Sequence, residues 1–141
     1  MNSYTIRDLT EGFTVRESFP VTEEMGIRFA EVSGDVNPVH LDREYAEKTR
    51  FHGRIAHGML VGSFISKVIG TSLPGEGSIY MKQDMKFVRP VRYGDTVTVV
   101  VSVKELQKEK NRVVLSTECY DQNGEKVIAG EALVMPKEET E

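Results

Sequence analysis

The hydrophobic pattern of this 141-residue chain changes its period once, near Ser78. Beyond that point apolar and polar residues alternate, which predicts β-strands whose side chains point to opposite faces in turn. We expect four such strands, near residues 79–87, 97–103, 113–119 and 128–135. Only short turn segments separate them (92–95, 107–111 and 121–124), and strands joined so closely have to be antiparallel. The second half of the chain is therefore confined to one antiparallel sheet.

Residues 57–71 form the longest apolar segment, and their apolar side chains cover most of a helix circumference. This predicts a helix buried nearly all round. Small residues recur along it at four-residue spacing, namely Gly58, Gly62, Ser66 and Gly70. Such a row lets backbone or ligand approach closely, although tight packing against neighbouring elements explains most of it equally well. Ser66 differs because a hydroxyl on a buried face needs a partner.

The remaining elements complete an α+β architecture in a single domain, residues 1–141. Residues 12–20 alternate as expected of a fifth strand. Thr22 is suited to cap a helix whose apolar face carries Met25, Phe29 and Val32. Asp42 is suited to cap a second, shorter helix. A five-stranded sheet is roughly 20–24 Å wide and a fifteen-residue helix is about 22 Å long, so one helix can lie across one sheet. Part of this system stays exposed, and dimerisation is a common remedy. We expect the acidic tail, residues 136–141, to be frayed.

Composition narrows the function classes. The net charge of −4 and the pI near 5.5 argue against nucleic-acid binding, which usually needs a basic face. The longest apolar segment is too short and too interrupted to span a bilayer, and no apolar secretory segment follows Met1. Cys119 is the only cysteine, which excludes an internal disulfide and fits a reducing compartment. We therefore expect a cytoplasmic protein with no membrane partner.

Residues 33–40 place a carboxylate and an imidazole five positions apart, at Asp35 and His40, on either side of an Asn37-Pro38 step. The residue before proline avoids the α region, so we expect a turn here rather than a helix. A turn could bring the two side chains to one point, where an acid and an imidazole can move protons in both directions near neutral pH. The ordinary alternative is a helix-capping aspartate followed by a surface loop.

Other sites for chemistry are poorly supported. His52 and His57 would lie about 140° apart on a helix, so we expect no metal site. Neither a phosphate-binding loop nor a Gly-x-Ser-x-Gly motif is present. His57 and Gly58 open the buried helix, where unpaired N–H groups could polarise a carbonyl oxygen. His57 itself either caps the helix and fills space or takes a direct part.

Several motifs occur together and in order between residues 12 and 135. They are Phe29-Ala30-x-x-Ser33-Gly34-Asp35-x-Asn37-Pro38-x-His40, His57-Gly58-Met59, Gly75-Glu76-Gly77-Ser78-Ile79-Tyr80 and Phe87-x-x-Pro90-Val91-x-x-Gly94-Asp95. In these motifs the chain resembles the MaoC-like (R)-specific enoyl-CoA hydratases. The resemblance implies the hot-dog fold, an antiparallel sheet wrapped around a long central helix, and a homodimer or a dimer of dimers.

The resemblance also implies a reaction, the addition of water across the C2–C3 double bond of a trans-2-enoyl-CoA. Asp35 would take a proton from the water, while His40 would position it and deliver a proton to C2, giving syn addition and an (R)-3-hydroxyacyl product. The thioester oxygen would bind at the Gly58 N–H, Ser66 would hydrogen-bond within the site, and Asn37 would hold the loop. Coenzyme A is part of the substrate, so no cofactor is expected.

Substrate contacts and rival functions stay open at this point. The acyl pocket is expected along the buried helix and the first strand after it, although the same residues suit a plain core: Met59, Val61, Phe64, Ile65, Ile69 and Met85. Cations that could meet CoA phosphates are Lys82, Lys86, Arg89 and Arg92. The alternatives are a 3-hydroxyacyl-ACP dehydratase of fatty-acid synthesis, a thioester hydrolase and a non-catalytic acyl-CoA-binding module. Supply of polyhydroxyalkanoate precursors is one expected use of the product.

Overall fold

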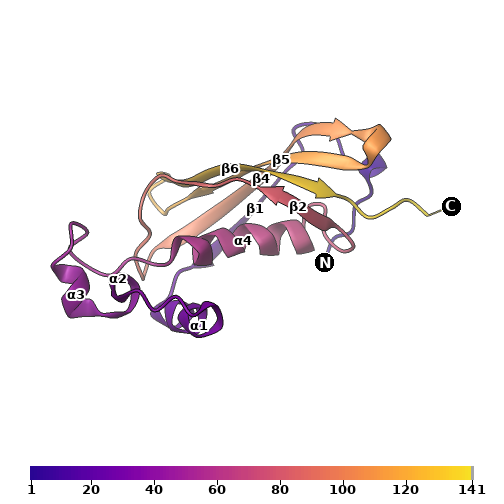
Figure 1. Cartoon of the computed structure of the whole chain (residues 1–141). Helices are drawn as coiled ribbons and strands as arrows, with labels where there is room; N and C mark the ends of the chain where they lie inside the picture. Colours follow the sequence, from indigo (N-terminus) through magenta and orange to yellow (C-terminus); the bar gives the residue numbers. More distant parts are fainter. Residues whose placement is uncertain (141) are drawn as a thin grey trace.

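The computed structural model describes residues 1–140. The strands are β1 (Thr14–Pro20), β2 (Ile79–Gln83), β3 (Lys86–Phe87), β4 (Thr96–Gln107), β5 (Arg112–Tyr120) and β6 (Lys126–Met135). The helices are α1 (Glu23–Ser33), α2 (Pro38–Leu41), α3 (Arg43–Glu47) and α4 (Gly58–Thr71), with short 3-10 turns η1 (Ile6–Asp8) and η2 (Lys108–Lys110). One sheet lies over α4, and α1, α2 and α3 gather at one end of the molecule (Figure 1).

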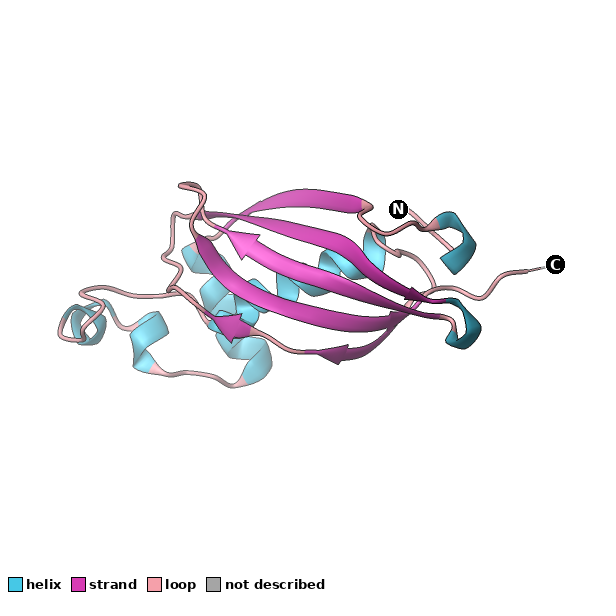
Figure 2. Cartoon of the chain, turned by 90° about the horizontal axis from the view of Figure 1, so that it is seen from above, coloured by secondary structure: helices cyan, strands magenta, loops and turns pink. Residues whose placement is uncertain are grey.

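The sheet has the order β1-β4-β5-β6-β2, and all of its pairings are antiparallel. Figure 2 shows the strands side by side in front of the helices. The expected antiparallel sheet around a central helix is confirmed, with one difference in the strand expected over 79–87. That strand is divided into β2 and β3, which both pair with β6. Asp84 lies at the break, where its N–H donates to the Glu131 carbonyl and its Oδ1 accepts from the Glu131 N–H. The backbone passes so close that a Cβ on Gly130 would lie 2.1 Å from the Asp84 oxygen.

The core lies between α4 and the inner face of the sheet. Alternate residues of β4 point inward, and Val97, Val99 and Val101 are fully buried there. Ile65 and Val68 of α4 are equally buried against this face. The two periods read from the sequence, two for the strands and 3.6 for the helix, therefore meet in one apolar layer.

Two expectations about helix faces are wrong. Val32 was placed on the apolar face of α1, but its side chain is 87% exposed. Met25 and Phe29, the other residues expected on that face, do pack against the core, and Gly26 and Ala30 are buried. A Cβ on Gly26 would collide with the Tyr93 ring, so glycine makes this contact possible. The second expectation concerns α4, which is not buried all round: Met59 and Ser66 are exposed. A single sheet covers only one side of a helix, and α1 covers only part of the other.

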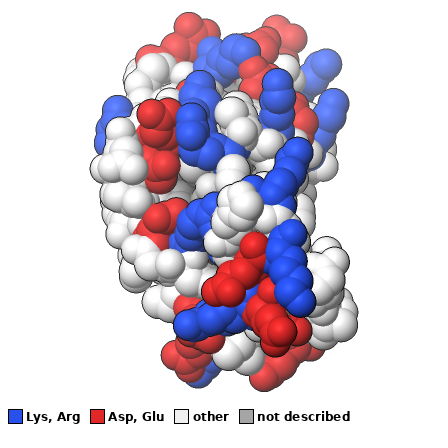
Figure 3. Space-filling model, turned by 90° about the vertical axis from the view of Figure 1, so that its left-hand side faces the viewer, with Lys and Arg blue, Asp and Glu red and all other residues white. Residues whose placement is uncertain are grey.

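The surface carries both signs of charge. On the end of the molecule seen in Figure 3, Lys and Arg side chains are interspersed with Asp and Glu, and no uniformly basic face is visible there. Among the described residues, no helix combines the length and the apolar character that a membrane span requires.

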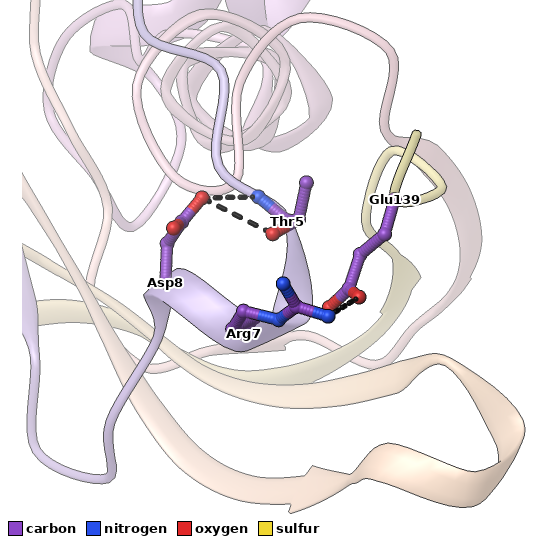
Figure 4. Close-up of polar contacts among 4 residues, drawn as sticks. All are labelled: Thr5, Arg7, Asp8 and Glu139. Carbon is purple, nitrogen blue, oxygen red and sulfur yellow. Dashed lines mark hydrogen bonds and ion pairs between the residues drawn. The ribbon is translucent and has the colours of Figure 1, made fainter. Parts of the chain in front are cut away.

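The tail after β6 has no regular structure, but it is tied to the rest of the chain. Glu139 forms an ion pair with Arg7, while Asp8 accepts two hydrogen bonds from Thr5 and so caps η1 (Figure 4). Asn111 donates to the Pro136 carbonyl. The expected fraying of residues 136–140 stays a prediction, and residue 141 lies outside the described part of the chain.

Candidate active site

A chain of local hydrogen bonds shapes the loop that carries Asp35. Helix α1 ends at Gly34, whose φ of 80° is in the left-handed region that favours glycine. The Ser33 hydroxyl donates to the Phe29 carbonyl (2.7 Å) and accepts from the Asp35 N–H (3.0 Å). The Asp35 carboxylate in turn accepts from the Asn37 N–H (3.2 Å). The loop therefore folds back on itself, and the Asp35 side chain is exposed at its turn.

His40 lies on α2, a single helical turn, and this corrects the expectation that the segment would contain no helix. Asn37 itself is not helical, as a residue before proline should not be, and its side chain accepts from the Val39 N–H. Pro38 occupies the first helical position, where its missing N–H is not needed. The helix therefore starts directly after the Asn-Pro step, and His40 reaches the site at its end.

Two contacts orient His40. Its Nδ1 lies 2.8 Å from the Ile55 carbonyl, and because a carbonyl only accepts, Nδ1 carries the proton. The other ring nitrogen, Nε2, is then a proton acceptor in the neutral ring. The Tyr93 hydroxyl donates to the His40 carbonyl (2.9 Å), and burial raises the pKa of Tyr93, which keeps this donor protonated.

The loop and α2 bring three side chains to one place. One oxygen or nitrogen from each of Asp35, His40 and His57 lies within 4.8 Å of the other two. A separation of this order leaves room for a water molecule between an acid and an imidazole. The expected convergence of Asp35 and His40 is therefore present, and the ordinary alternative of an unconnected capping aspartate does not fit.

A cavity of about 410 Å³ opens at this cluster. Asp35, His40, His57 and Gly58 line part of it. The rest of its lining is mostly apolar but includes two arginines: Arg50, Ile55, Val61, Phe87, Arg89, Val91 and Ile128. A cavity of this size with a few convergent polar groups is typical of a small-molecule site.

Gly58 places the beginning of α4 at this cavity. As the first residue of the helix it has an N–H that no helical carbonyl can accept. A Cβ at this position would lie only 2.8 Å from a Phe87 ring carbon, so glycine keeps the helix end close to that ring. A ligand oxygen here would meet an unpaired donor and the positive end of a helix dipole.

His57 caps α4 by position only, because its side chain makes no capping hydrogen bond. Its ring is 1% exposed and lies against the His40 ring, with 4.0 Å between ring centres and 28° between planes. Its Nε2 lies 2.9 Å from the Asp35 carbonyl, so this nitrogen donates.

The same cluster is the one candidate for a metal site in the described part of the chain. The expectation of no metal site rested on the spacing of His52 and His57, whereas the structure groups His57 with Asp35 and His40. A metal ion has to lie in the plane of each imidazole ring that binds it. The His40 and His57 rings are stacked, with 4.0 Å between ring centres and 28° between planes, so the two ring planes do not meet within bonding reach of both rings. The geometry is poorly suited to a metal ion.

The expected acyl-pocket residues are not brought together at the cluster. Phe64, Ile65 and Ile69 do not line this cavity and lie in the core instead. Ser66 and Met85 line a second cavity of about 470 Å³, together with Phe29, Gly62, Tyr80, Met81 and Lys82. Ser66 follows Gly58 by two turns, about 12 Å along the helix. Met59 and Val61 do line the cavity at the cluster, and Met59 borders both.

Arg50 and Phe51 were not predicted as site residues from the sequence. Both line the cavity, and the Arg50 guanidinium lies over the Phe51 ring at 5.0 Å. Their only sequence signal is a basic-aromatic pair in a loop, which is common on surfaces. Among the expected cations, Arg89 lines this cavity, Lys82 borders the second one, and Arg92 donates to the Phe51 carbonyl.

Comparison with known proteins places this geometry in a family. A family model described as "MaoC like domain" matches residues 7–123. An (R)-specific enoyl-CoA hydratase from Rhodospirillum rubrum is 48% identical over 128 residues, which cover 91% of this chain and 88% of the relative. A 3-hydroxybutyryl-CoA dehydratase from Methylorubrum extorquens is 44% identical, with 94% and 84% covered.

Among solved structures, the unliganded R-hydratase PhaJ1 from Pseudomonas aeruginosa superposes with a TM-score of 0.91 and 45% identity. The superposition covers 96% of this chain and 86% of that one. The family match over residues 7–123 and the similarity to these relatives show that the chain belongs to the family of MaoC-like domains and has its hot-dog fold.

Proposed function

We propose that this protein catalyses the (R)-specific hydration of trans-2-enoyl-CoA to (R)-3-hydroxyacyl-CoA, and the reverse dehydration. The observation that carries the proposal is the approach of the Asp35 and His40 side chains, within 4.8 Å, at an apolar cavity that also contains the start of α4. The names of the relatives from R. rubrum and M. extorquens describe the two directions of this one reaction.

The proposed mechanism assigns one proton transfer to each side chain. The Asp35 carboxylate takes a proton from the water, whose oxygen bonds to C3, and protonated His40 gives its Nε2 proton to C2. The C2–C3 double bond becomes a single bond, which leaves Asp35 protonated and His40 neutral with its Nδ1 proton still directed at Ile55. The proton on Asp35 returns to Nε2 of His40 before the next turnover. Because both groups act from the same side of the cavity, the hydrogen at C2 and the hydroxyl at C3 are added to the same face, which is syn addition.

The developing negative charge is on the thioester oxygen. The Gly58 N–H is the proposed donor for this oxygen, with the dipole of α4 adding to the stabilisation. Asn37 is proposed to act indirectly, by capping α2 and so holding His40 in place. Ser66 lines the second cavity, so the hydrogen bond expected from its hydroxyl is not part of the mechanism proposed at this site.

The cavity lining suggests how the substrate lies. Met59, Val61 and Phe87 supply an apolar surface for the acyl chain, and Arg50 and Arg89 offer cations for the phosphates of coenzyme A. The mechanism uses only side chains, one backbone N–H and water, so we propose no cofactor and no metal. A cytoplasmic location and a use of the product as polyhydroxyalkanoate precursor stay predictions.

Incubation with crotonyl-CoA tests the function. Hydration removes the ultraviolet absorption of the enoyl thioester without releasing free thiol, and chiral analysis should find the (R)-3-hydroxybutyryl product. Asp35→Asn and His40→Gln should each lower kcat by about 10²–10⁴-fold, the range for general acid–base groups. Release of free thiol would indicate a hydrolase, and binding without turnover an acyl-CoA-binding module. A strong preference for (R)-3-hydroxyacyl-ACP over the CoA thioester would move the protein to fatty-acid synthesis.

We also infer that two copies pair along β2. This strand ends the sheet, and its side chains Ile79, Tyr80 and Met81 are exposed by 56%, 39% and 43%. The second cavity, between β2 and the open face of α4, adds further uncovered apolar surface. An unpaired apolar edge strand is unfavourable in a monomer, and pairing with the same edge of a second copy would cover it.

A further inference from the structure

We infer that His57 is a positioning residue that holds both members of the proposed Asp35–His40 pair in their working geometry. The inference rests on the proposed hydratase function and adds to it a third residue that does not itself exchange protons with the substrate. Among the described side chains, that of His57 contacts both partners: Nε2 donates to the Asp35 carbonyl and the ring face lies on the His40 ring.

The hydrogen bond from His57 constrains the carbonyl side of the Asp35 backbone. The Asp35 N–H already donates to the Ser33 hydroxyl at 3.0 Å, and the His57 Nε2 lies 2.9 Å from the Asp35 carbonyl. Both bonds come from helices or their ends, α1 on one side and α4 on the other. The carboxylate therefore projects from a residue whose two peptide groups are both constrained, although its side chain is exposed.

The contact with His40 fixes the ring plane. The Ile55 carbonyl sets the direction of Nδ1 at one edge of the ring, but one hydrogen bond leaves the ring free to rock about it. The His57 ring removes this freedom by lying against the face, and Phe29 packs on His57 with 4.9 Å between ring centres. Small displacements of reacting groups are costly for a proton transfer, so this constraint bears on the rate.

A purely structural role accounts poorly for the residue type. The ring is 1% exposed, and Nδ1 is buried with no hydrogen-bond partner in the part of the chain that is described. An unsatisfied buried nitrogen destabilises a core, and a phenylalanine would fill similar space without it. What phenylalanine cannot supply is the Nε2–H donor to Asp35.

Two substitutions separate the donor from the ring. His57→Phe keeps a flat ring against His40 but removes the donor, while His57→Gln places an amide N–H close to the position of Nε2. His52→Asn is the matched control, because His52 is exposed, lies outside both cavities and has a positive φ that asparagine tolerates. Each variant is assayed for crotonyl-CoA hydration, with kcat and KM determined separately and folding checked by thermal melting.

We expect His57→Phe to lower kcat about 10–100-fold with KM within about twofold, and to melt no lower than wild type. His57→Gln keeps the donor but lacks the ring, so its kcat should fall by less than about tenfold, and His52→Asn should match wild type. If His57→Phe does not fold, His57→Leu, which lacks both the donor and the ring, is compared with His57→Gln, and its kcat should fall further than that of the Gln variant. The inference is overturned if the Phe variant keeps full kcat, if the folded Gln variant loses as much as the Phe variant, or if KM rises in place of the fall in kcat. A wild-type protein that does not hydrate crotonyl-CoA would instead refute the proposed function.

Discussion

Gly58→Ala tests whether the start of α4 receives the thioester oxygen. The added Cβ would lie 2.8 Å from Cε1 and 2.9 Å from Cδ1 of Phe87. Carbon atoms in contact lie about 3.5–4.0 Å apart, so the ring has to move by about 1 Å. Phe87 is 51% exposed and can do so, but it lines the cavity, and the new methyl group itself occupies space beside the N–H.

The expected effects on stability and on activity differ. Alanine is favoured over glycine in a helix by up to about 1 kcal/mol, which offsets much of the crowding, so the free energy of unfolding should change by less than about 1 kcal/mol. A reacting group displaced by about 1 Å can lose about 10²-fold in rate, and loss of one donor to a developing oxyanion costs about 10²–10³-fold. We therefore expect kcat for crotonyl-CoA to fall by about 10–100-fold in a protein that is folded normally.

Gly70→Ala provides a matched control on the same helix. A Cβ at Gly70 meets no described atom within 4 Å, so this variant should gain about 0.5–1 kcal/mol of stability and keep the wild-type kcat. Urea denaturation and steady-state hydration kinetics give both quantities for the two variants. Wild-type turnover by a folded Gly58→Ala protein would refute the proposal that the substrate oxygen binds at this helix end.

Two further predictions concern assembly and alkaline stability. Met81→Lys puts a charge on the exposed β2 edge, so sedimentation equilibrium should show a monomer in place of the dimer. Val32→Lys, on the open face of α1, is the control and should leave the dimer intact. An unchanged mass for Met81→Lys would exclude pairing along β2. Burial raises the pKa of the Cys119 thiol from 9.0 to about 12. The unfolded chain therefore loses this proton first as the pH rises, and stability should fall from about pH 9 to about pH 12 by about 1.4 kcal/mol per pH unit from this group. Urea melts across that range should show a shallower fall in Cys119→Ala, and equal slopes would contradict the assignment.

The sequence predicted the fold closely because its signals are local and repeated. Alternation over β4, β5 and β6 together with short turns allows one antiparallel sheet, and the continuous apolar segment allows one helix to cover it. The caps at Thr22 and Asp42 are also confirmed, since each accepts the hydrogen bond expected of an N-cap. The break at Asp84 was not predicted, because it depends on the approach of the chain to Gly130 on another strand.

Helix faces were predicted less well, for a physical reason. A period of 3.6 residues identifies an apolar stripe but does not tell how wide a surface the rest of the fold will cover. Val32, Met59 and Ser66 are exposed because one sheet and one short helix leave the far side of α1 and α4 open. Covering that side requires a second molecule or a ligand, which the pattern of a single chain does not specify.

The available chemical groups can be read from the sequence: one carboxylate and one imidazole around an Asn-Pro step, and a helix that begins with glycine. What these groups face depends on how the chain packs in three dimensions. His57 is 17 residues beyond His40 and 22 beyond Asp35 in the chain, yet it bonds to one and stacks on the other. Contacts across such separations follow from the packing of α1 and α2 against the start of α4, and no local periodicity encodes them.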